Sequence, residues 1–244
     1  LDRSSAASDV YKRQNKRYMV QPLGGGQLLE LSWADVGEQA RRAASWLRSR
    51  ELPQGSRIAI ISKNCAHWIV ADLAIWMAGH VSVPLYPNLT ADSMGQVLEH
   101  SEAALAFVGK LDDWASMAPG LPQGLPTVSL PLHPQGSFDY SWDDLQHSAP
   151  IQDDPKPAAN QLATIIYTSG TTGTPKGVMH NFSNFGFAAS NAIKLFGVGE
   201  DDRLISYLPL CHVAERMFVE LASIYAGQAI FFAESLDTFL EDLK

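Results

Sequence analysis

Residues 167–178 near the middle of the chain read YTSGTTGTPKGV and combine the groups that hold a polyphosphate. Gly170, Gly173 and Gly177 let the backbone turn tightly and bring its N–H groups close to anionic oxygens. Hydroxyl groups donate to the same oxygens, and Lys176 adds a mobile positive charge. The hydroxyl residues are Thr168, Ser169, Thr171, Thr172 and Thr174. We therefore expect a phosphate-binding loop here.

The loop is not a Walker A motif, which requires G-x-x-x-x-G-K-[ST]. Counted from Gly170, Pro175 stands where the second glycine belongs, and Gly177 stands where the metal-binding Ser or Thr belongs. A flexible Gly/Ser/Thr linker is the alternative. The apolar run at 162–166 directly before the loop, and the Pro-Lys-Gly within it, argue against a linker.

These residues resemble the signature of the adenylate-forming superfamily, which includes acyl-CoA synthetases, luciferases and peptide-synthetase adenylation domains. A second segment, SYLPLCHVAERM at 206–217, is similar to long-chain fatty acid–CoA ligases in particular. Weaker similarity lies at 78–87 and 226–234, so the resemblance covers about residues 28–244.

The resemblance implies a reaction in two halves. A fatty carboxylate attacks the α-phosphorus of ATP, and the thiol of coenzyme A then displaces AMP. The residues implied to wrap the β- and γ-phosphates are Thr168, Ser169, Gly170, Thr171, Thr172 and Gly173. Lys176 is implied to neutralise the departing pyrophosphate, with Mg²⁺ bridging the same oxygens. A loop hydroxyl in the metal's shell is implied too, and Thr168 is the candidate.

His212 is the second candidate catalytic residue after Lys176, and two interpretations of it remain open. The resemblance places its motif along the acyl and adenylate site, where His212 would line the carboxylate end of the pocket. A histidine that opens a helix and hydrogen-bonds locally explains the sequence equally well, because Pro209 ends the preceding strand. For Glu215 and Arg216 we expect a local ion pair that orients the helix.

Composition narrows the function classes. The chain has 244 residues, 46% of them hydrophobic, and a formal net charge of −8. Nucleic-acid binding through a broad basic surface is therefore not expected. The two cysteines, Cys65 and Cys211, lie far apart, which argues against a disulfide framework or zinc site and favours the cytoplasm.

A substrate that partitions into lipid is compatible with peripheral membrane contact, but no basic amphipathic helix indicates it. Oligomeric state is not readable from the sequence.

Short apolar runs alternate along the chain with segments in which apolar residues recur at helical spacing. This pattern predicts an α/β fold with doubly wound, mainly parallel sheets and flanking helices. We expect strands at 57–62, 81–86, 104–108, 127–130, 162–167, 177–180, 203–208 and 228–233. Helices are expected from 33 to 47, 67 to 78, 182 to 196 and 212 to 226, from Thr90, and after 235. Residues 1–14 are expected to be a non-native or disordered tail, 15–150 a first α/β subdomain, and 151–244 a second one with the phosphate loop.

The resemblance further implies that the chain is the incomplete large N-terminal domain of such an enzyme, and we expect it to be inactive by itself. The family's adenine-, ribose- and magnesium-binding motifs and its C-terminal lysine domain have no counterpart in the sequence. Two alternatives stay open. One is another adenylating enzyme that acts on an aryl or amino acid, and the other is a non-catalytic nucleotide-binding or interaction module.

Overall fold

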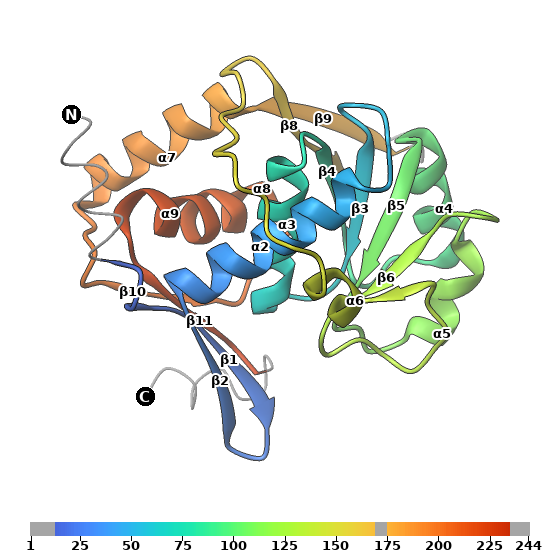
Figure 1. The fold of residues 1–244 in the computed structure, drawn as a ribbon, viewed down its shortest axis with the longest axis horizontal. Helices are drawn as coiled ribbons and strands as arrows, with labels where there is room; N and C mark the ends of the chain where they lie inside the picture. Colours follow the sequence, from blue (N-terminus) through green and yellow to red (C-terminus); the bar gives the residue numbers. More distant parts are fainter. Residues whose placement is uncertain (1–12, 169–174, 235–244) are drawn as a thin grey trace.

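The computed structural model describes residues 13–168 and 175–234. These residues form two β-sheets with helices packed between and around them (Figure 1). The larger sheet has seven strands in the order β7-β6-β5-β3-β4-β8-β9, and the smaller has four in the order β10-β11-β1-β2. The α/β class with mainly parallel sheets is therefore confirmed.

The seven-stranded sheet is parallel except at one edge. Its strands are β3 (Arg57–Ile61), β4 (Val81–Leu85), β5 (Ala103–Val108), β6 (Thr127–Ser129), β7 (Tyr140–Ser141), β8 (Leu162–Thr168) and β9 (Lys176–Asn181). Only β9 runs antiparallel to its neighbour, because it forms a hairpin with β8. The chain leaves β3 for β4 on one side and then reaches β5 on the other. At such a reversal, open α/β sheets bind ligands outside the carboxyl ends of their strands.

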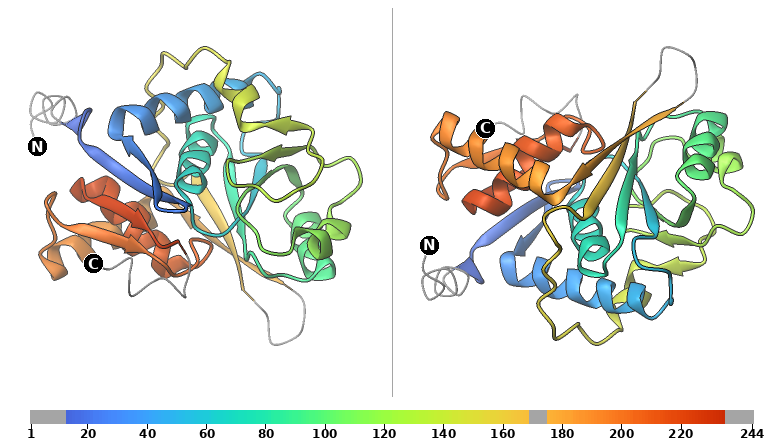
Figure 2. Two further views of the ribbon diagram at one scale, coloured as in Figure 1. Left: turned by 90° about the horizontal axis from the view of Figure 1, so that it is seen from below. Right: turned by 90° about the horizontal axis from the view of Figure 1, so that it is seen from above.

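Both faces of this sheet are covered, and alternate residues of β3 serve the two cores. Ile58 and Ile60 pack with α2 (Trp33–Arg48) and α3 (Ala66–Met77). Ala59 and Ile61 pack with α4 (Ala91–His100) and α5 (Trp114–Met117), which lie on the opposite face (Figure 2). A strand buried on both faces has no polar side, which explains the apolar run from Ile58 to Ile61. The short η1 (Ala118–Gly120) and α6 (Trp142–Gln146) complete this half.

Helix α2 begins as its sequence predicts. Ser32 accepts a hydrogen bond from the Asp35 N–H, and the Asp35 side chain bonds back to the Ser32 N–H, which makes a capping box. The predicted inner face is confirmed at Val36, Ala40, Ala43 and Leu47, all of which are buried. Trp33, expected on the same face, is only partly buried and stacks on Tyr18 at 3.6 Å between ring centroids.

The four-stranded sheet joins the two ends of the described chain. Its strands are β1 (Arg17–Gly24), β2 (Gln27–Ser32), β10 (Arg203–Ser206) and β11 (Ala229–Phe232). The β1–β2 hairpin was not predicted from the sequence. β1 pairs in parallel with β11, where Met19 lies opposite Ile230. Both sheets thus take strands from either side of residue 150, and the predicted division there stays a prediction.

The predicted helix at 212–226 is confirmed as one helical segment with a wider middle. It consists of α8 (Val213–Glu215), the π-helical turns η2 (Arg216–Leu221) and α9 (Ala222–Ala226), and it ends at Gly227 with a φ of 84°. The predicted helix at 182–196 is α7 (Phe182–Phe196), and it packs beside η2 and α9. The predicted helix after 235 lies outside the described residues. In the part of the chain that the structure describes, no helix is long and apolar enough to cross a membrane.

Candidate functional site

The β8–β9 hairpin positions the two ends of the predicted phosphate loop. Thr168, the last residue of β8, pairs with Lys176, the first residue of β9, and both are exposed. Directly opposed residues of an antiparallel pair present their side chains on the same face. The hydroxyl and the ammonium group therefore leave the hairpin on one side. The predicted phosphate ligands Ser169, Gly170, Thr171, Thr172 and Gly173 lie outside the described residues.

A cavity of about 530 Å³ lies beside this hairpin at the carboxyl edge of the seven-stranded sheet. It is lined by the ends of β4 and β8, by α4 and the turn before it, and by the start of α8. Thr168, Pro175 and His212 all line it. Two sequence segments about forty residues apart thus meet at one cavity, although Lys176 is not among its lining residues.

His212 both caps a helix and lines the cavity, the two interpretations that the sequence left open. It is the N-cap of α8, and its Nδ1 accepts a hydrogen bond from the Ala214 N–H at 3.2 Å. Its side chain is nevertheless exposed and lines the cavity. A neutral imidazole that accepts at Nδ1 carries its proton at Nε2. The local hydrogen bond therefore fixes a tautomer whose Nε2–H is a hydrogen-bond donor.

The expected ion pair between Glu215 and Arg216 is wrong, because successive helix residues do not face each other. Glu215 is buried, and its carboxylate accepts hydrogen bonds from the Ser206 hydroxyl at 2.9 Å and the Tyr207 N–H at 3.0 Å. Burial raises the pKa of Glu215 to about 7, although the two hydrogen bonds oppose this. Glu215 therefore holds Ser206 and Tyr207, the first two residues of its own motif, in place.

Arg216 lies in the core between the sheets and is fully buried. It forms ion pairs with Asp72 of α3 and, at 3.1 Å, with Glu220 one turn along its own helix. It also donates to the Thr164 hydroxyl of β8 at 2.7 Å. Burial opposes its charge, but the two carboxylates outweigh this and raise the pKa of Arg216. Arg216 thus links α3 and η2 to β8, a role that the sequence did not indicate.

The β8 strand is also held from its other side, through Tyr167. The Tyr167 hydroxyl lies 2.7 Å from Nδ1 of His100 at the end of α4. The Tyr167 ring and the Ile165 side chain lie close to Gly177. A Cβ added to Gly177 would come within 2.7 Å of Ile165 Cγ2 and 3.1 Å of Tyr167 Cζ. Gly177 is therefore required for packing within the hairpin.

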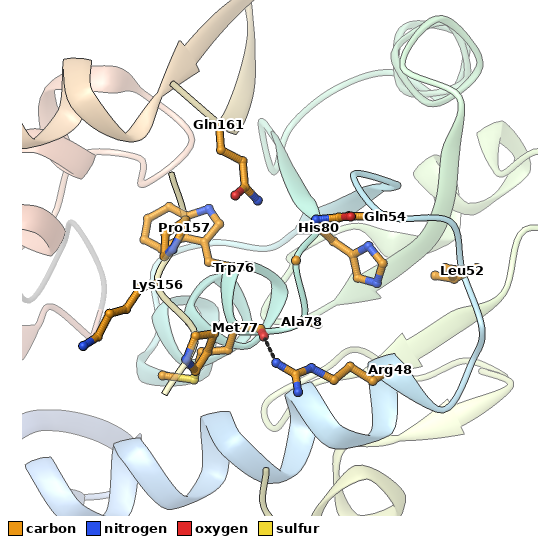
Figure 3. A pocket seen from close by; sticks show the side chains of 12 residues that line it. Arg48, Leu52, Gln54, Trp76, Met77, Ala78, His80, Lys156, Pro157 and Gln161 are labelled. Carbon is orange, nitrogen blue, oxygen red and sulfur yellow. Dashed lines mark hydrogen bonds between the residues drawn. The ribbon is translucent and has the colours of Figure 1, made fainter. Parts of the chain in front are cut away.

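A second depression, of about 440 Å³, lies at the opposite, amino edge of the sheet (Figure 3). Arg48, Trp76, His80, Lys156 and Gln161 are among its lining residues. Its cations already have partners: Arg48 donates to the Met77 carbonyl at 2.8 Å and pairs with Asp153, and Lys156 pairs with Asp154. It contains none of the predicted site residues.

Metal-binding clusters are not a feature of the described residues. No group of three His, Cys, Asp or Glu side chains within 13–168 and 175–234 is placed to hold a metal ion. Cys65 and Cys211 are buried free thiols, and burial raises the pKa of both.

Known proteins similar to this chain include several CoA ligases. It is 30% identical over 93% of its length to a probable CoA ligase, CCL6, of Humulus lupulus, and 32% identical over 84% to the long-chain-fatty-acid–CoA ligase ACSBG2 of Rattus norvegicus. It is 29% identical over 98% to the long-chain-fatty-acid–CoA ligase FadD15 of Mycobacterium bovis. The chain spans only 37%, 33% and 41% of these relatives.

Solved structures show the same fold. The anthranilate CoA ligase AuaEII in complex with anthranoyl-AMP aligns with a TM-score of 0.84 at 18% identity, over 97% of this chain and 45% of that one. A putative long-chain-fatty-acid CoA ligase from Rhodopseudomonas palustris aligns with a TM-score of 0.78 at 25% identity, over 96% and 59%.

The sequence model described as AMP-binding enzyme matches residues 7–244, which begins inside the segment expected to be a tail. The hairpin, the cavity at the carboxyl edge and this match lead to one conclusion. The chain belongs to the AMP-binding family of adenylate-forming CoA ligases.

Proposed function

We propose that the protein carrying this chain activates a fatty acid, first to an acyl-adenylate and then to acyl-CoA, and that this chain supplies its ATP-phosphate-binding part. The observation that carries the proposal is the cavity that joins Thr168 and Pro175 of the hairpin to His212. It lies at the carboxyl edge where open α/β sheets bind ligands.

The first step joins two anions, so the site must screen charge on the triphosphate. A carboxylate oxygen of the acid forms a bond to the α-phosphorus while the bond to pyrophosphate breaks. Thr168 and Lys176 leave the hairpin on one face, where they would contact the β- and γ-phosphates together with residues 169–173. Lys176 would then stabilise the charge that develops on the departing pyrophosphate.

The available donors fit Mg²⁺ bound chiefly through phosphate oxygens. Mg²⁺ is commonly held by one or two protein groups together with substrate phosphates and water. The described residues offer the exposed Thr168 hydroxyl at the cavity and no cluster of acidic side chains. When bound, the ion would supply positive charge to the triphosphate oxygens.

The acyl side of the cavity supports an apolar carboxylic acid. Aliphatic side chains of Leu85, Leu89, Val97, Ile166 and Val213 line it, which suits a hydrocarbon chain. The Nε2–H of His212 would donate to the carboxylate. In the second step the sulfur of coenzyme A bonds to the acyl carbon, and the bond to AMP breaks.

Two buried free thiols fit a protein of the reducing cytoplasm.

The test is ATP–pyrophosphate exchange by the complete protein with a panel of acids. We expect exchange with palmitate, and Lys176→Ala should lower its rate by about tenfold or more, because a charge that faces the pyrophosphate is lost. Lys194→Ala, an exposed lysine on α7, is the matched control and should leave the rate unchanged. An undiminished rate in Lys176→Ala would remove the role given to this residue.

The same panel separates the second candidate function. An aryl-acid ligase is favoured by one observation, the TM-score of 0.84 to the anthranilate CoA ligase. Exchange with benzoate-type acids but not with palmitate would select it. ATP binding without exchange for any acid would instead indicate a non-catalytic nucleotide-binding module.

A further inference from the structure

We propose that Asn64 is a positioning residue for the turn at 207–212, through which it sets where His212 stands at the cavity. The proposal rests on the proposed function for its kinetic part. Asn64 lies outside both sequence motifs, three residues after the end of β3 and directly before the N-cap of α3. It does not line the cavity.

The Asn64 side chain uses its amide in three hydrogen bonds to one segment. Its Nδ2 donates to the Ser206 hydroxyl at 2.8 Å and to the Leu208 carbonyl at 2.6 Å. Its Oδ1 accepts from the Leu210 N–H at 2.8 Å. The bonds bridge 142 to 146 residues of sequence, so they are tertiary contacts that only the folded chain makes.

Residues 207–212 need such side-chain hydrogen bonds because, among the described residues, they belong to no strand of either sheet. β10 ends at Ser206 and α8 begins at Val213, so the backbone groups between them require other hydrogen bonds. Glu215 supplies a second brace from the helix side, since the Ser206 hydroxyl donates to Glu215 and accepts from Asn64. The His212 N–H closes the turn by donating to the Pro209 carbonyl at 2.8 Å.

The chemistry of the amide explains why asparagine stands here. The turn presents a carbonyl and an N–H two residues apart, so one side chain must both donate and accept. An aspartate keeps the acceptor but places a carboxylate against the Leu208 carbonyl. An alanine leaves the Leu208 carbonyl and the Leu210 N–H without this partner, which should loosen the turn.

The kinetic test compares Asn64→Ala with Asn191→Ala, an exposed asparagine on α7, in the complete protein. Asn64→Ala should lower kcat/KM for the acid by about tenfold, with a smaller change in KM for ATP. Because Asn64 acts through His212, its effect should shrink in a His212→Ala background. Fully additive effects, or equal losses for acid and ATP, would overturn the proposal.

A second measurement is independent of activity and of the proposed function. Amide hydrogen exchange of the folded chain should be faster at Leu210 in Asn64→Ala, with a smaller increase in Asn64→Asp, which keeps the acceptor but loses the donor to Leu208. Unchanged exchange at Leu210 in Asn64→Ala would refute the brace itself. If no acid supports activity in the wild type, the proposed function fails, while this exchange result still decides whether Asn64 orders the turn.

Discussion

Arg216 shows how a motif residue can serve the site from within the core. One guanidinium faces two carboxylates, Asp72 and Glu220, and all three side chains are fully buried. Burial raises the pKa of Glu220 well above its usual range, with the nearby charge of Asp72 adding to the effect. Asp72 Oδ1 and Glu220 Oε1 lack hydrogen-bond partners among the described residues. A proton on Glu220 would remove the excess negative charge and provide a donor.

Replacing the guanidinium should therefore be costly. Arg216→Met leaves buried carboxylates without a cation, and we expect the free energy of unfolding in urea to fall by about 3–5 kcal/mol. The added changes Asp72→Asn and Glu220→Gln should recover much of the loss, because no charge then remains buried. Arg17→Met, which breaks an exposed pair with Glu30, is the control and should cost about 1 kcal/mol or less. A similar cost at both arginines would show that the buried cluster is unimportant.

At the scale of elements, the β8–β9 hairpin depends on the missing side chain of Gly177. A methyl group there would overlap Ile165 and Tyr167, so Gly177→Ala should lower the free energy of unfolding by about 1–3 kcal/mol. It should also reduce exchange activity, because Tyr167 leads into Thr168 at the cavity. Gly37→Ala in α2 is the matched control, since its added Cβ meets nothing within 4 Å and should stabilise the helix. Equal stability of the two variants would show that the hairpin tolerates a side chain.

The sequence predicted those elements whose signals are local. Helix α7 has its predicted bounds, and strands β8 and β9 lie within one residue of the predicted 162–167 and 177–180. The β1–β2 hairpin was not predicted, because part of its support comes from β11, which pairs with β1 from two hundred residues later in the sequence. Asn64 was missed for the same reason: a single asparagine carries no periodic pattern, and its three partners are distant in sequence.

At the scale of the whole molecule, the two sheets share one of the two cores that flank the seven-stranded sheet. Buried residues of the seven-stranded sheet, such as Ile58 and Phe107, belong to the same apolar cluster as Met19 and Ile230 of the four-stranded sheet. The Tyr18 hydroxyl also lies 3.1 Å from the Ser223 hydroxyl, between β1 and α9. A continuous core predicts that the halves before and after residue 150 unfold together.

The tryptophans make this cooperativity measurable, because all six lie in the first half, from Trp33 to Trp142. Trp76, which donates to the Ala163 carbonyl and packs on Phe182, also reports on the contact with the second half. Ile230→Ala opens a cavity in the second half and should cost about 2–5 kcal/mol. If the core is continuous, the tryptophan-monitored urea midpoint should fall by the same amount as the midpoint from far-ultraviolet circular dichroism. Leu195→Ala, an exposed leucine on α7, should move neither midpoint. A tryptophan transition that stays in place while the dichroism transition shifts would instead establish two independent subdomains, because the loss of packing at Ile230 would then not reach the first half.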